Sequence, residues 1–153
     1  MDTCLICERI DLIKKGTNPY VVKELETGYV VIGDHQFCRG YTLFLCKIHA
    51  TELHELEPDF RYTFLREMST VAEAVWRAFH PVKLNYELLG NSDPHLHWHI
   101  FPRHHDDPEP RRPIWLIGAD IRKAKESEPN PEELINLKNA LLGELDALLL
   151  DKK

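Results

Sequence analysis

Residues 95–101 read HLHWHIF, in which three histidines alternate with apolar residues. Such alternation favours a β-strand, because successive side chains of a strand point to opposite faces of the sheet. The three histidines would then share one face, while Leu96, Trp98 and Ile100 would point into the layer behind it. The stretch therefore predicts a row of imidazoles along a buried strand.

Length and composition limit what surrounds this strand. The chain has 153 residues, of which 43% are hydrophobic, which suits one globular domain over residues 1–153. Its formal charge of −6 provides no basic field for a long nucleic acid or an anionic membrane. The first residues lack the features of a signal peptide, and no apolar run reaches the roughly 18 residues that a membrane span needs. We therefore expect a cytoplasmic protein without a membrane or long nucleic-acid partner.

The order of the predicted elements indicates an α+β fold with an antiparallel sheet. A long core-packing helix is expected from Pro58 until Pro81, with Trp76 in the core, and leucines at helical spacing predict a terminal amphipathic helix from Pro131. Residues 103–113 are polar and proline-rich, which indicates an irregular loop. Strands are expected at residues 20–25, 29–32, 40–46, 84–89 and 96–101.

Cys4 and Cys7 form a C-x-x-C pair. In a reducing compartment, such a pair is more typical of metal binding or redox work than of a disulfide. A pair of free thiols is the other reading, and a thioredoxin-like site is disfavoured because no βαβ pattern follows. Cys38 and Cys46 are interpreted as core or loop thiols.

The alternating histidines alone leave three interpretations open: a metal site, a phosphoryl-transfer site or a solvated strand face. Neutral imidazole attacks phosphorus well, and a covalent phospho-histidine divides one hard displacement into two easier ones. Same-face neighbours on a strand lie roughly 6.6 Å apart, so one ring could attack while the others bind phosphate oxygens. If all three rings bound a metal, none would be left to attack.

Several motifs together resemble the histidine triad (HIT) superfamily. Residues 95–101 match its His-φ-His-φ-His-φ-φ signature, where φ is apolar. The run from Cys4 to Cys7 resembles the zinc pair of many bacterial members, Gly40-Tyr41-Thr42-Leu43 resembles a strand that begins Gly-His in the family, and His49 falls where a Lys-Lys-His run ends. The resemblance covers residues 4–103, implies a HIT-like fold, and leaves residues 104–153 as a loop and a C-terminal helix.

The resemblance implies a nucleotide hydrolase or nucleotidyltransferase that cleaves at the α-phosphate of a small conjugate, either a dinucleoside polyphosphate or a nucleoside phosphoramidate. It implies that His97 is the nucleophile that forms a nucleotidyl-histidine, and that His99 binds a nonbridging phosphate oxygen. Ser92 matches the family position whose hydroxyl binds the phosphate or the leaving group. At the position before Ser92, Asn91 replaces the Gln that is usual in the family. Asp34 is implied to bind the ribose hydroxyls.

A structural zinc is also implied, held by Cys4, Cys7, His49 and His95. This Cys₂His₂ set has no open coordination position, so it would contribute to folding instead of chemistry. The family commonly forms dimers, which implies a homodimer.

One other function stays open at this point, a zinc-stabilised nucleotide-binding regulatory module with little turnover. A metal-dependent hydrolase is disfavoured by the closed ligand set. Beyond the motifs, Arg103 is interpreted as a surface charge, with a role in steering a polyphosphate as the alternative. Trp115 is expected to pack in the core, with contact to a base or a partner subunit as the alternative.

Overall fold

The computed structural model of the chain describes residues 4–151. At its centre lies a five-stranded antiparallel sheet with the order β1-β2-β3-β5-β4. The α+β class and the five expected strands are therefore confirmed. The strands are β1 (Val21–Glu24), β2 (Gly28–Ile32), β3 (Thr42–Cys46), β4 (Lys83–Glu87) and β5 (His97–Arg103).

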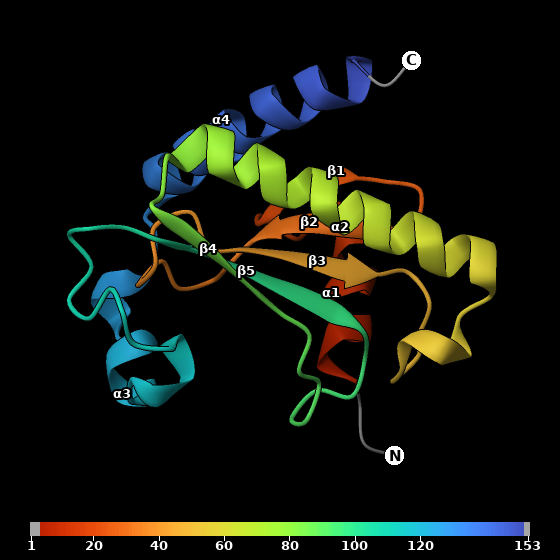
Figure 1. The fold of residues 1–153 in the computed structure, drawn as a ribbon, viewed down its shortest axis with the longest axis horizontal. Helices are drawn as coiled ribbons and strands as arrows, with labels where there is room; N and C mark the ends of the chain where they lie inside the picture. The colour runs from red at the N-terminus through yellow and green to blue at the C-terminus, as the bar shows by residue number, and fades with distance from the viewer. Residues whose placement is uncertain (1–3, 152–153) are drawn as a thin grey trace.

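Helices cover both faces of the sheet (Figure 1). The long helices α2 (Pro58–Phe79) and α4 (Pro131–Leu150) pack together on one face, over a core that includes Phe44 and Ile100. The other face is covered by α1 (Leu5–Lys14), whose Ile6 packs against the sheet. Four short helices complete the described chain: η1 (Leu53–Glu55), η2 (Ile114–Leu116), α3 (Ala119–Arg122) and η3 (Lys125–Ser127).

The expected long helices form as their sequences predict. A proline stands in the first turn of both α2 and α4, where its missing N–H costs no hydrogen bond. Asn130 and Glu133 form a capping box at the start of α4. Within residues 4–151, none of the helices has the length and apolar character of a membrane span.

Two features of the helices differ from expectation. The C-x-x-C pair opens a helix, α1, that the sequence pattern did not predict, and Cys4 is its N-cap residue. Trp76 is 45% exposed, so its placement in the core was wrong. Residue 76 lies about a third of a turn away from the centre of the buried stripe of α2, which includes Val71, Val75 and Phe79.

The register of the sheet decides which face carries the histidines. His97 lies opposite Leu45 of β3, and His99 lies opposite Leu43 of β3 and Glu87 of β4. Directly opposed residues share a face, so these histidines face the side of the sheet that α1 covers. Trp98 points to the other side, toward α2.

Candidate active site and metal centre

Four predicted metal ligands meet where α1 approaches the ends of β3 and β5. The ligand atoms of Cys4, Cys7, His49 and His95 all lie within 4.8 Å of one another. His95 Nδ1 lies 3.4 Å from Cys4 Sγ, 3.5 Å from Cys7 Sγ and 3.2 Å from His49 Nδ1. Zinc bonds of about 2.0–2.3 Å place tetrahedral ligand atoms roughly 3.3–3.8 Å apart. The donor set therefore fits a tetrahedral metal ion such as zinc.

The surroundings of His95 prepare its ring to bind a metal. His95 is 1% exposed, and its Nε2 lies 2.8 Å from the carbonyl oxygen of Cys46, to which it donates. That hydrogen bond places the ring proton on Nε2 and leaves the Nδ1 lone pair free. Burial lowers the pKa of His95, so the ring stays neutral, as a metal ligand must be.

His97 is held in one tautomer by the backbone. Its side chain is buried, and its Nδ1 lies 2.5 Å from the carbonyl oxygen of His95. Since a carbonyl only accepts, Nδ1 carries the proton, and Nε2 of the neutral ring keeps its lone pair. Within residues 4–151 no hydrogen bond engages Nε2. His97 lines a cavity of about 450 Å³, so this ring has the form that a nucleophile requires.

His99 is held in the opposite tautomer by Tyr41. The Tyr41 hydroxyl lies 2.6 Å from His99 Nδ1 and has no other partner in the described chain. A buried hydroxyl needs an acceptor, so it donates to Nδ1, and the proton of the neutral ring stands on Nε2. Burial raises the pKa of Tyr41, and burial together with the nearby His97 lowers the pKa of His99 to about 3. Both groups are therefore neutral at pH 7.

A glycine makes room for the Tyr41 ring. A Cβ atom at Gly33 would lie 2.2 Å from that ring, which is too close for two carbon atoms that are not bonded. Any residue other than glycine would therefore clash with Tyr41. The Tyr41 ring also stacks on the ring of Phe101, with the two centroids 4.1 Å apart. The space at Gly33 and the stacking on Phe101 therefore hold the Tyr41 ring beside His99.

The remaining predicted substrate contacts also reach the cavity. Asn91 and Ser92 line it from the loop before β5, and Asp34 lines it from the end of β2. The carboxylate of Asp34 pairs with the guanidinium of Arg9, which α1 contributes. Sequence reasoning did not foresee Arg9, because nothing in the α1 sequence marks its partner 25 residues away.

Trp115 forms a wall of the cavity beside His99. Its ring lies edge-on to the His99 ring, with centroids 5.3 Å apart, and its indole N–H donates to the carboxylate of Glu87. The guanidinium carbon of Arg122 lies 4.8 Å from the centroid of the Trp115 ring. Trp115 is 39% exposed, so the prediction of simple core packing was wrong.

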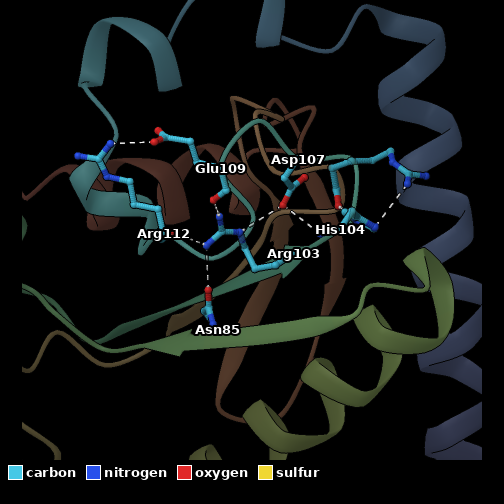
Figure 2. Close-up of polar contacts among 7 residues, drawn as sticks. Asn85, Arg103, His104, Asp107, Glu109 and Arg112 are labelled. Carbon is cyan, nitrogen blue, oxygen red and sulfur yellow. Dashed lines mark hydrogen bonds and ion pairs between the residues drawn. The ribbon is translucent and has the colours of Figure 1, made fainter.

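Arg103 is buried, and the expectation of a surface charge was wrong. The loop after β5 folds back over the guanidinium, which donates to the carboxylate of Asp107, the Asn85 side chain and the carbonyl oxygens of Glu109 and Arg112. Figure 2 shows this network, whose labelled residues are Asn85, Arg103, His104, Asp107, Glu109 and Arg112. The irregular loop is thus ordered around one cation, just before the segment that carries Trp115.

Known proteins resemble the chain in sequence and in fold. The family model for the HIT domain matches residues 18–106. "Protein hit" of Bacillus subtilis (strain 168) is 26% identical over 150 residues, covering 94% of this chain and 95% of that protein. A histidine triad protein from Bradyrhizobium japonicum has a TM-score of 0.72 at 24% identity, over 82% of this chain and 89% of its own.

A Zn-bound histidine triad family protein from Mycobacterium smegmatis also has the same fold. Its TM-score is 0.62 at 24% identity, over 95% of this chain and 96% of its own. The part of the chain that the family model matches does not include Arg122, nor Cys4, Cys7 and Arg9 at the start of the chain.

Proposed function

This chain belongs to the HIT domain family, and from that premise we propose that it is a nucleotide hydrolase or nucleotidyltransferase. The proposed reaction cleaves a small nucleotide conjugate at its α-phosphate, the conjugate being a dinucleoside polyphosphate or a nucleoside phosphoramidate. One observation carries the proposal: Nδ1 of His97 is tied to a backbone carbonyl, so the Nε2 lone pair is available in a cavity. An imidazole in this state needs no base to activate it.

The first step is attack by Nε2 of His97 on the α-phosphorus. A phosphorus–nitrogen bond forms, the bond to the leaving group breaks, and the leaving atom takes the bonding electron pair. An amine nitrogen also takes a proton from water as it leaves, whereas a polyphosphate oxygen leaves as the anion. The Nδ1 proton stays in its hydrogen bond to the His95 carbonyl, which stabilises the positive charge that develops on the ring. Water then hydrolyses the nucleotidyl-histidine and releases a nucleoside monophosphate.

The neighbouring groups bind the substrate. His99, protonated on Nε2, donates to a nonbridging oxygen, a contact that strengthens as charge builds on that oxygen. The Ser92 hydroxyl and the Asn91 amide bind the phosphate or the leaving group from the loop before β5, and Asp34 accepts from the ribose hydroxyls. The ion pair with Arg9 leaves carboxylate lone pairs of Asp34 for that role.

We further propose that Cys4, Cys7, His49 and His95 hold a structural zinc. The separations between these donor atoms support a tetrahedral ion, and a Zn-bound histidine triad protein has the same fold. Four protein ligands leave no coordination position for substrate. The metal would therefore stabilise the fold and the start of β5.

A homodimer is also proposed. β4 is an edge strand, and Tyr86 on it is 49% exposed. Pairing of two such edges, related by a two-fold axis, would satisfy backbone groups and cover this side chain. Light scattering during size-exclusion chromatography should give twice the chain mass, and a monomer across the micromolar range would rule the dimer out.

The test of the catalytic proposal uses diadenosine tetraphosphate and adenosine 5′-phosphoramidate as substrates. His97→Ala should lower turnover by on the order of 10³-fold or more and abolish the nucleotidyl-protein seen by mass spectrometry of quenched wild-type reactions. His105→Ala is the matched control, because His105 is exposed and outside the cavity. Tight nucleotide binding by the wild type, with no turnover and no adduct, would instead favour the regulatory module.

A further inference from the structure

We propose that Arg122 and Lys123 form a cationic subsite for the leaving group, so that the cavity selects conjugates whose leaving group is itself phosphorylated. Both residues line the same cavity as His97 and His99. This inference rests on the proposed function and adds a choice between its two substrate classes. It favours dinucleoside polyphosphates, whose leaving groups are anionic, over phosphoramidates, whose leaving groups are neutral amines.

The first argument is position. Arg122 ends α3 and Lys123 is the residue after it, in a segment that follows the part of the chain that the family model matches. The Arg122 Nε–H donates to the carbonyl oxygen of Ile117 at 2.8 Å, and its guanidinium lies over the Trp115 ring. These two contacts fix the cation while its terminal N–H groups make no hydrogen bond within the described chain.

The second argument is continuity with the reacting centre. The Trp115 ring contacts both Arg122 and His99. The charge of Arg122 also acts on the Tyr41 hydroxyl beside His99, where it opposes the rise in pKa that burial, Asp34 and Glu87 cause. A phosphate chain that starts at His97 and passes His99 would therefore run along Trp115 toward Arg122.

The third argument is charge balance. Of the other charged groups that line the cavity, Arg9 and Asp34 neutralise each other, and Asp93 is the remaining carboxylate. The nearby Glu87 accepts the indole N–H of Trp115. Within residues 4–151, neither cation of the subsite forms an ion pair, although the whole chain carries a net charge of −6.

The chemistry of both side chains suits a phosphate. The planar fork of a guanidinium can donate two parallel hydrogen bonds to phosphate oxygens, and the lysine ammonium adds a point charge. When the bond to the α-phosphorus breaks, a polyphosphate leaving group gains negative charge next to these cations. An amine leaving group gains nothing from them, so the preference should appear in the chemical step as well as in binding.

The experiment compares two substrates in one double variant, Arg122→Gln with Lys123→Gln. With diadenosine tetraphosphate, kcat/KM should fall at least tenfold, and with adenosine 5′-phosphoramidate it should change less than twofold. The matched control, Lys125→Gln with Arg111→Gln, removes the same charge from residues outside this cavity and should leave both rates unchanged. Added salt should weaken the preference in the wild type more than in the double variant.

An equal loss with both substrates would mean that the two residues only support Trp115 and the fold, and it would overturn the inference, as would no loss with either. Arg122→Lys, with Lys123 retained, should keep more of the rate with diadenosine tetraphosphate than Arg122→Gln does, because it keeps the charge although it loses the planar fork. If the wild type turns over neither substrate and forms no adduct, the proposed function fails by itself. In that case, calorimetric binding of inorganic tripolyphosphate tests the cationic subsite separately. The double variant should bind tripolyphosphate at least tenfold more weakly than the wild type, and equal affinity would contradict the subsite.

Discussion

Tyr41 determines which nitrogen of His99 carries the proton. Its hydroxyl lies 2.6 Å from Nδ1 and stays protonated, because burial raises the pKa of the phenol. The superfamily strand that Gly40-Tyr41 resembles begins Gly-His, and a histidine at position 41 would itself change charge near neutral pH. With tyrosine, His99 keeps Nε2–H as a donor across the physiological pH range. Gly33 makes this possible by leaving space for the ring.

Tyr41→Phe keeps the stacking on Phe101 and removes only the hydroxyl. His99 Nδ1 would lose its hydrogen bond in a buried site, which should cost about 1–3 kcal/mol of stability. The ring would then populate both tautomers, so kcat should fall by roughly tenfold while KM changes little. Nitrogen-15 NMR of the His99 ring reports the tautomer directly. Unchanged kcat with a single Nε2–H tautomer would contradict this role, and Tyr62→Phe, at an exposed tyrosine of α2, is the control.

At the scale of elements, the loop between β5 and η2 depends on the buried cation of Arg103. The side chains of Arg103 and Asp107 are only 4% and 8% exposed, and the guanidinium also binds two backbone carbonyls of the loop. This network sets the path of the chain that brings Trp115 to the cavity. A buried ion pair adds little net stability, because both charges lose their hydration, but removal of one partner leaves the other charge buried and unpaired. We therefore assign the pair a role in holding the loop in one conformation.

Arg103→Met should therefore destabilise the fold by about 3–5 kcal/mol, since it leaves the Asp107 carboxylate buried without its cation. Equilibrium unfolding in denaturant measures the loss. Arg112→Gln removes an exposed ion pair with Glu109 and should cost less than about 1 kcal/mol. Similar losses in the two variants would show that Arg103 acts as an ordinary surface charge.

The elements differ in how well the sequence predicts them. The strands and the helices α2 and α4 follow from regular hydrophobic spacing and from their prolines, which are local signals. Helix α1 is short and mixes apolar with charged residues, so its pattern is weak. The short helices of residues 114–127 have no periodicity at all, and their place depends on the fold around them.

The site divides in the same way. The motifs predicted that Cys4, Cys7, His49 and His95 would converge, and the structure brings them together. The roles of the triad and loop residues stay predictions. The burial of Arg103 and the approach of Arg122 to the cavity could not be predicted, because they depend on contacts between distant segments.

At the scale of the whole molecule, the candidate metal ligands join three separate parts of the fold. Cys4 and Cys7 come from the start of α1, His49 follows β3, and His95 precedes β5. An ion that binds only the folded chain stabilises it by about 3–4 kcal/mol when its free concentration is 100 to 1,000 times its Kd. The proposed zinc should therefore contribute to global stability.

Cys7→Ser should lower the zinc content and the midpoint of thermal unfolding. Chelation of the wild type should give a similar midpoint, because both remove the same ion. Plasma emission spectrometry and calorimetry measure the two quantities. Cys38→Ala is the control, because Cys38 is a buried thiol in a separate cluster and should leave zinc bound. Full zinc content in Cys7→Ser would remove Cys7 from the ligand set.

His95 serves two neighbours at once: its ring belongs to the metal set, and its carbonyl oxygen accepts from His97. Anything that lets this residue turn would release His97, the proposed nucleophile, from its single tautomer. We therefore expect the specific activity of different preparations to track how fully they were loaded with zinc during expression. An under-loaded batch would imitate an enzyme with a damaged nucleophile, although every reactive group would still be present.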